Sequence, residues 1–136
     1  MLTVVTGAPC SGKTTYVQQH AGPGDIVIDF DLIAQALGSP VTHGHSHPIT
    51  RTAQAARRAA INAAISHHRR GARVWIVECD PTMEMQAHYH RSGARFVSLR
   101  VSKDELHRRA DDRPDAWHGL IDHHLARQGD HGQARW

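Results

Sequence analysis

The sequence predicts a single α/β domain, with a mostly parallel sheet of about four strands and helices on both faces. Short apolar runs alternate with helix-forming segments along the whole chain, without an internal repeat or a linker. The run VWIV is apolar at successive positions, as expected of a parallel strand that is covered on both faces. A length of 136 residues, 40% of them hydrophobic, suits one core.

The first half of the chain divides at its glycines and prolines. Residues 2–6 (LTVVT) read as a short buried strand, and a glycine-containing turn follows them. The helix expected at 13–20 stops at AGPG, where glycine and proline end it. DIVID (25–29) is the second strand, and 30–38 is a short helix that ends at its own glycine. The Pro, Gly and Ser content of 39–50 predicts a loop.

Residues 52–70 are rich in alanine and predict a helix closed by the next glycine. The third strand is expected at 73–80. Residues 81–93 predict a helix, because a proline stands at the start and a glycine at the end. The fourth strand is expected at 94–101.

Two helices complete the predicted domain, at 102–110 and 115–128. The first opens with Ser102 and Glu105 at the spacing of a capping box. From about residue 128 to residue 136 we expect a frayed tail.

Charge is distributed unevenly along the chain. Residues 1–50 carry a formal charge of −2 and residues 51–136 one of +5. This asymmetry favours an anionic substrate bound by the later half, although a general bias toward arginine would produce the same pattern. No apolar run approaches the ~20 residues that a membrane span requires, and Cys10 and Cys79 fit free thiols. We therefore expect a cytoplasmic protein without a membrane partner.

A glycine-rich motif follows the first predicted strand. It matches G-x-x-x-x-G-K-[ST] without a mismatch and lies between a strand and a helix, as phosphate-binding loops do. Such loops use glycine so that backbone N–H groups can converge on phosphate oxygens, and the helix dipole adds positive charge. A chance glycine turn is the alternative. The motif predicts a three-layer P-loop NTPase fold that binds ATP and Mg²⁺. The residues expected to bind the nucleotide are Gly7, Ala8, Pro9, Cys10, Ser11, Gly12, Lys13, Thr14 and Thr15.

Within this motif, Lys13 supplies a mobile positive charge for the β- and γ-phosphates and is expected to be catalytic, while the Thr14 hydroxyl can bind Mg²⁺. Asp29 and Asp31 follow the second strand, where open α/β sheets bind their ligands. A carboxylate there could take the proton of an acceptor hydroxyl. We favour Asp31 for that catalytic role over Asp29, although Asp31 also suits a helix N-cap.

Two further clusters flank the expected nucleotide site. Glu78 and Asp80 end the third strand, and Asp80 either supports Mg²⁺ or caps the next helix. Arg109 and Arg113 are four residues apart after the fourth strand. They are either catalytic arginines on a mobile lid or part of a solvated helix face.

The matching pieces GAPCSGKTT, IDFD, VECDPT and ELHRRADDRP resemble the kinase domain of bacteriophage-type polynucleotide 5′-kinases, from residue 1 to about residue 113. The resemblance implies that Asp31 is the general base for a 5′-hydroxyl and that Asp80 lies near the metal. It also implies that Arg109 and Arg113 contact the donor phosphates. The family places an arginine shortly after the base, where this chain has Ala34.

Other residues could therefore bind the acceptor. The loop THGHSHP and the helix after it offer basic side chains, and Arg51 and Arg58 share one helical face. Zinc binding by the three histidines and an ordinary polar loop are the alternatives. The candidate acceptor-binding residues are Asp29, His43, His45, His47, Arg51 and Arg58.

The function that these residues predict is an ATP-dependent kinase with a hydroxyl acceptor, foremost the 5′-OH of DNA or RNA. A kinase for a nucleoside, modified base, sugar or antibiotic remains open, as does an ATP-binding or ATPase module that is not a kinase. The sequence leaves the oligomeric state open.

Overall fold

In the computed structural model, which describes residues 1–133, four parallel strands form one sheet in the order β2-β3-β1-β4. The strands are β1 (Leu2–Gly7), β2 (Ile26–Ile28), β3 (Val74–Glu78) and β4 (Arg95–Leu99). The helices are α1 (Lys13–His20), α2 (Phe30–Ala36), α3 (His47–His68), α4 (Met83–Arg91), α5 (Lys103–Ala110) and α6 (Ala116–Gln133). The predicted α/β class and the mostly parallel sheet are confirmed.

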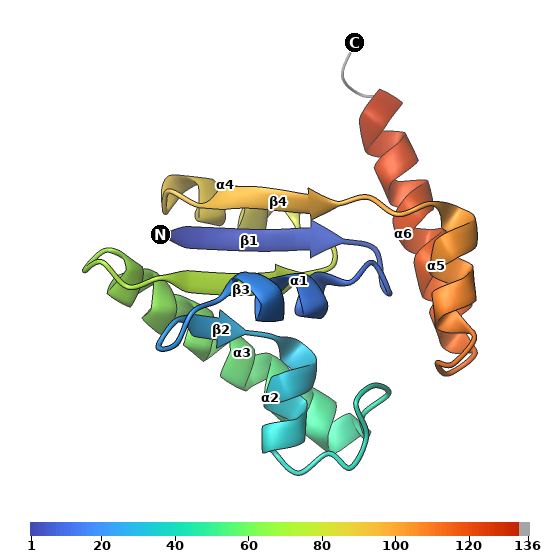
Figure 1. Cartoon of the computed structure of the whole chain (residues 1–136), viewed down its shortest axis with the longest axis horizontal. Helices are drawn as coiled ribbons and strands as arrows, with labels where there is room; N and C mark the ends of the chain where they lie inside the picture. The colour runs from blue at the N-terminus through green and yellow to red at the C-terminus, as the bar shows by residue number, and fades with distance from the viewer. Residues whose placement is uncertain (134–136) are drawn as a thin grey trace.

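The sheet lies between two layers of helices. On one face, the cluster around Val4 and Ile76 packs against Ile61 of α3 and Tyr89 of α4. On the other face, Val5 and Trp75 pack against α1. Alternate residues of each strand therefore serve opposite faces, as the pleat requires. All four strands point toward one edge, where the turn after β1, α5 and α6 lie (Figure 1).

A third, smaller cluster holds α5 and α6 at this edge. Leu106 and Ala110 of α5 and Ile121 of α6 are buried against Ala8, which follows β1. The C-terminal helices therefore pack directly on the glycine-rich turn.

The largest difference from the predicted boundaries is at α3, which begins at His47 rather than at residue 52. Ser46 is its N-cap and Pro48 lies in its first turn. Proline is compatible with both a loop and the start of a helix, because its missing N–H would be unpaired there in any case. His47 therefore belongs to the helix and not to the predicted loop.

The C-terminal helix also departs from the prediction. We expected the tail to fray from about residue 128, but α6 continues to Gln133. The remaining part of the expected tail lies outside the described residues. Among the described helices, none has the length and apolar character needed to cross a membrane. Both cysteines are free.

Candidate functional site

The turn between β1 and α1 needs glycine at two positions. Cys10 and Gly12 adopt positive φ angles of 67° and 89°. A Cβ on Gly7 would lie 2.5 Å from Oγ of Ser11 and 2.9 Å from the carbonyl oxygen of Leu99. Gly7 is therefore required by close approach, and Gly12 by its left-handed conformation at the N-cap of α1.

Lys13 folds back over this turn. Its Nζ donates hydrogen bonds to the carbonyl oxygens of Gly7 (2.8 Å) and Ala8 (2.7 Å), and the residue is only 7% exposed. Oγ of Ser11 is buried without a hydrogen-bond partner in the described part of the chain. Buried polar groups normally have partners, so the Ser11 hydroxyl is the exception in this turn. Nucleotide binding by the residues of this turn stays a prediction.

Thr14 and Asp29 join this turn to the end of β2. The Thr14 hydroxyl donates to Oδ2 of Asp29 at 2.6 Å, and Asp29 is buried. The other oxygen of Asp29 accepts from the backbone N–H groups of Asp31 and Leu32 and caps α2. The N-cap of α2 is therefore Asp29, and the alternative that Asp31 is the cap is wrong.

Asp31 does not cap α2, and its carboxylate contacts two histidines. Its Oδ2 lies 3.0 Å from Nδ1 of His43, and its Oδ1 lies 2.7 Å from Nε2 of His45. The His45 side chain is only 2% exposed, and its Nδ1 lies 2.6 Å from Oγ of Ser39. Two of the three predicted loop histidines are thus brought to Asp31.

His47, the third of these histidines, is exposed in the first turn of α3. Within residues 1–133 there is no group of three or more His, Cys, Asp or Glu side chains arranged to hold a metal ion. The zinc alternative for the histidine loop therefore has no support from the geometry.

The two predicted lid arginines approach the glycine-rich turn from the other side. Arg109 donates to the carbonyl oxygen of Cys10 at 3.1 Å and to Glu105 at 2.9 Å. The spacing of four residues suggested that Arg109 and Arg113 share one helical face. This is wrong, because α5 ends at Ala110. Both arginines nevertheless line one cavity of about 550 Å³, together with Cys10, Ser11, Gly12, Thr15, Tyr16, Gln19 and Leu99.

Arg113 also reaches the histidine loop through an aromatic ring. Its guanidinium carbon lies 5.1 Å from the centre of the Trp117 ring, a cation–π distance. The same ring meets His43 edge-on, with 5.0 Å between ring centres. The segment after α5 is therefore in contact with the residues that surround Asp31.

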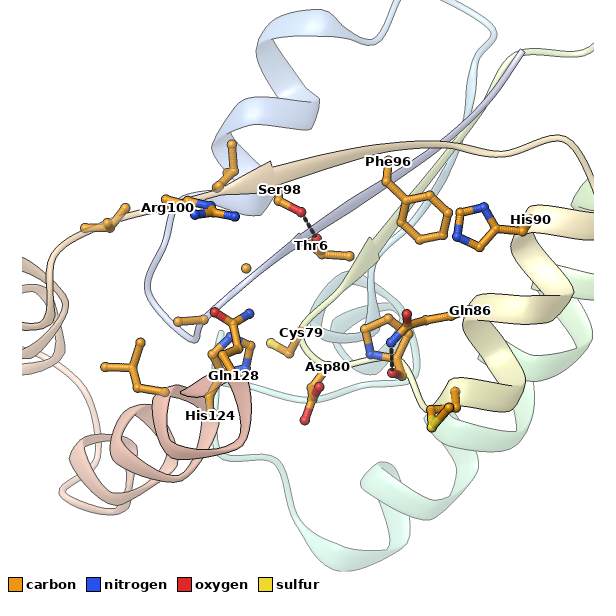
Figure 2. A pocket seen from close by; sticks show the side chains of 17 residues that line it. Thr6, Cys79, Asp80, Gln86, His90, Phe96, Ser98, Arg100, His124 and Gln128 are labelled. Carbon is orange, nitrogen blue, oxygen red and sulfur yellow. Dashed lines mark hydrogen bonds between the residues drawn. The ribbon is translucent and has the colours of Figure 1, made fainter. Parts of the chain in front are cut away.

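A larger cavity, of about 910 Å³, lies beside the end of β1, between α4 and α6 (Figure 2). Asp80 lines it and pairs with Arg127 of α6 at 3.0 Å. The N-cap of α4 is Thr82, so Asp80 does not cap that helix. Buried His124 also lines the cavity, and desolvation lowers the pKa of its imidazole, opposed by the charge of Asp80.

The remaining predicted residues lie apart from these groups. Glu78 accepts from Arg57 of α3 at 2.8 Å and from the Tyr89 hydroxyl at 3.2 Å, so its carboxylate ties two helices to the sheet. Arg51 and Arg58 are exposed on α3, and neither pairs with a described acidic residue.

Trp117, His124 and Arg127 were not singled out as site residues from the sequence. Each lies on α6, whose pattern indicated only a helix near the end of the chain. Their position depends on how α6 packs on the turn after β1. The local sequence pattern of α6 does not predict this packing.

Comparison with known proteins gives a likeness of fold. No protein-family model and no curated protein sequence matches the chain. Among solved structures, one chain of a structure described as "Structure of Pnkp1/Rnl/Hen1 complex" is similar, with a TM-score of 0.59 and 14% sequence identity. The match covers 83% of this chain and 40% of that chain. At this identity the likeness supports the three-layer α/β fold, and this chain corresponds to less than half of its neighbour.

Proposed function

We propose that this chain is an ATP-dependent kinase that transfers the γ-phosphate to a hydroxyl acceptor, with a polynucleotide 5′-OH as the first candidate. The observation that carries the proposal is the hydrogen bond from Thr14 to Asp29. Through it, the first turn after the glycine-rich loop is tied to the segment that presents Asp31. A phosphate-binding turn and a carboxylate held beside it are the two parts that phosphoryl transfer to a hydroxyl requires.

The donor side is supported by charge. Lys13 and Arg109 contact carbonyl oxygens of the loop, and Arg113 lines the same cavity as Arg109. The transferred phosphoryl group spreads negative charge that such groups stabilise. Their positive charge explains why a nucleoside triphosphate is the donor that we propose.

Thr14 and Asp80 are the residues that we propose for Mg²⁺. A hydroxyl and a carboxylate are oxygen donors of the kind this ion prefers. When bound, Mg²⁺ would supply charge that neutralises the phosphate oxygens. The chain itself holds each donor with one partner, Asp29 for the Thr14 hydroxyl and Arg127 for the Asp80 carboxylate.

Two observations support a polynucleotide as the acceptor. The structural neighbour's description names Pnkp1, which agrees with the resemblance of the sequence to polynucleotide kinases. Exposed Arg51 and Arg58 offer unpaired positive charge on α3 for a phosphodiester backbone.

One observation favours a small-molecule acceptor as the second candidate. Ala34 stands where the resemblance leads us to expect an arginine that grips the acceptor phosphate, and it is completely buried. That position therefore cannot contact a phosphate of the acceptor. An acceptor without such a phosphate, such as a nucleoside or a sugar, would not need the contact.

A transfer screen separates these candidates. The purified chain is incubated with magnesium and γ-labelled ATP, together with 5′-OH oligonucleotides, nucleosides, sugars or no acceptor. Labelled oligonucleotide, formed with a KM that rises steeply with salt, supports the first candidate, because salt weakens phosphate contacts. Labelled small molecule supports the second. Free labelled phosphate with no labelled acceptor would contradict a kinase.

A further inference from the structure

Asp31, the expected general base, is enclosed by nitrogen donors on both sides. His43 approaches one carboxylate oxygen and His45 the other, at 3.0 and 2.7 Å. An ionised carboxylate only accepts hydrogen bonds, so the nitrogen on each side must carry a hydrogen. For His43 that nitrogen is Nδ1.

The position of this hydrogen decides what His43 can do. A neutral imidazole carries one N–H, so a hydrogen on Nδ1 leaves a lone pair on Nε2. Nε2 of His43 makes no hydrogen bond to a described residue, and the side chain is 24% exposed. His43 thus offers a free basic nitrogen.

The surroundings of His43 keep its ring neutral. Burial lowers the pKa of His43 below its ordinary 6.5, and Arg113 and His45 act in the same direction against the charge of Asp31. Asp31 belongs to α2, His45 to the same loop and Arg113 to the segment before α6. The uncharged ring of Trp117 packs on the edge of His43 from α6. At pH 7 the imidazole is therefore ready to accept a proton.

We propose that His43 is the catalytic residue that takes the proton from the acceptor hydroxyl, and that Asp31 is the positioning residue that holds its ring. This inference rests on the proposed function and goes beyond it, because the resemblance assigns the base to Asp31. A carboxylate that fixes the imidazole tautomer and stabilises the imidazolium is the arrangement of serine-hydrolase triads. His45, buried between Asp31 and Ser39, holds the carboxylate in place.

The chemistry favours the imidazole over the carboxylate as the base. Both carboxylate oxygens of Asp31 already accept a hydrogen bond from a histidine ring, whereas Nε2 of His43 has a lone pair without a described partner. General-base catalysis is most effective when the pKa of the base lies near the working pH. The ordinary pKa of an imidazole, about 6.5, lies much closer to neutral pH than that of an aspartate, about 3.9.

The proposed transfer forms one bond to the γ-phosphorus and breaks another. The acceptor oxygen forms a bond to the γ-phosphorus, while the bond from that phosphorus to the β–γ bridging oxygen breaks and its electrons leave with the nucleoside diphosphate. The hydroxyl proton moves to Nε2 of His43, which becomes an imidazolium beside Asp31. Solvent then takes the proton and restores the neutral ring.

His43→Asn separates the two candidate bases. The asparagine amide can still donate to Asp31 in place of Nδ1, but it has nothing in place of Nε2. We expect kcat for transfer to fall by about 10²- to 10⁴-fold, the usual contribution of a general base, with ATP binding unchanged. His67→Asn, an exposed histidine near the end of α3, is the matched control and should keep wild-type activity. Retention of kcat within about fivefold in His43→Asn would overturn the inference.

A measurement on the wild-type protein without nucleotide gives an independent test. Nitrogen-15 NMR of the histidine rings distinguishes the two neutral tautomers. We expect His43 above pH 7 to carry its hydrogen on Nδ1, and to titrate below 6.5. A hydrogen on Nε2 would contradict the proposal even if His43→Asn failed to fold.

The same experiments distinguish a failure of the proposed kinase function from a failure of the proposed role of His43. Transfer by the wild-type chain together with an active His43→Asn variant overturns only the role of His43. A wild-type chain that labels no acceptor overturns the kinase, and the role of His43 with it.

Discussion

The Thr14 hydroxyl donates a hydrogen bond to Oδ2 of Asp29 at 2.6 Å, from the first turn of α1 to the residue that caps α2. Two segments that are fifteen residues apart in the chain are thereby fixed to one another. The glycine-rich turn and the carboxyl end of β2 are therefore held together as one unit. The position of Asp31 relative to this turn depends on that unit.

The first prediction concerns Asp29. Asp29→Ala removes the N-cap of α2 and the partner of Thr14, so we expect the free energy of unfolding to fall by about 1–2 kcal/mol. Asp29→Asn keeps a capping side chain and should lose less than half as much. Urea unfolding followed by circular dichroism measures both. Equal losses for the two variants would show that the cap is not what Asp29 contributes.

The second prediction concerns close approach at Gly7. A Cβ there would meet both Oγ of Ser11 and the backbone of Leu99. Gly7→Ala should therefore destabilise the chain by about 1–3 kcal/mol. Gly119→Ala is the control with the opposite sign, because this glycine lies inside α6 with open space around it and alanine favours helices by about 1 kcal/mol. Thermal melts of the two variants should move in opposite directions, and a Gly7→Ala melt at or above wild type would contradict this account.

The third prediction concerns the arginine that touches the glycine-rich turn. Arg109→Ala removes a positive charge bonded to the Cys10 carbonyl, beside the proposed phosphates. We expect kcat for transfer to fall by about 10²- to 10³-fold, the effect of losing one group that stabilises the transition state. Neighbouring Arg108 pairs with Glu105 and is exposed, so Arg108→Ala should leave kcat within about twofold. Steady-state kinetics decide between them, and similar losses for both arginines would argue for a general effect of charge.

The fourth prediction is a pH dependence of stability. Burial lowers the pKa of both His43 and His124 in the folded chain. The folded state then binds fewer protons than the unfolded state, so stability rises with pH across this window. The contribution is complete above about pH 6.5, the ordinary value, and is lost as pH falls through the lowered pKa values. We expect the melting temperature to fall between pH 7.5 and pH 5.

His124→Gln tests the source of that loss. This variant should show a smaller difference in melting temperature between the two pH values than the wild type does. His67→Gln, an exposed histidine near the end of α3, should keep the full difference. An unchanged pH dependence in His124→Gln would remove buried His124 from the explanation.

The sequence was sufficient to predict all four strands, because each is a short apolar run bounded by turn residues or charges. The glycine-rich turn between β1 and α1 was also predictable, since Gly7 and Gly12 lie at a fixed spacing where close approach and a left-handed backbone require glycine. The predicted start of α3 was wrong because Pro48 is compatible with a loop and also with the first turn of a helix, where it lies. The alternative role of Asp31 as an N-cap was wrong because the neighbouring Asp29 provides the cap.

The environment of Asp31 could not be predicted. His43 and His45 reach it from twelve and fourteen residues away, through a loop whose path depends on contacts with other segments. One of those contacts places Pro114 beside Gly44, and another places Trp117 against His43. Such contacts follow from the packing of α6, which the local pattern of the sequence does not encode.

The central claim is that the turn from Gly7 to Thr14 holds a nucleoside triphosphate while the Asp31 segment serves the acceptor. Two comparisons separate these roles. Lys13→Ala should weaken binding of ATP with magnesium by about tenfold to a hundredfold, because it removes a charged partner of the phosphates. Lys103→Ala, the other lysine of the chain, is exposed and should not change it.

The most direct test measures phosphate transfer and ATP binding on the same preparations of the wild-type chain and Asp31→Ala. With γ-labelled ATP, magnesium and a 5′-OH oligonucleotide, we predict labelled oligonucleotide from the wild type. Asp31→Ala should bind ATP with wild-type affinity in a calorimeter and transfer label at least about a hundredfold more slowly. Wild-type protein that binds no ATP, or Asp31→Ala that transfers label at the wild-type rate, would contradict the account.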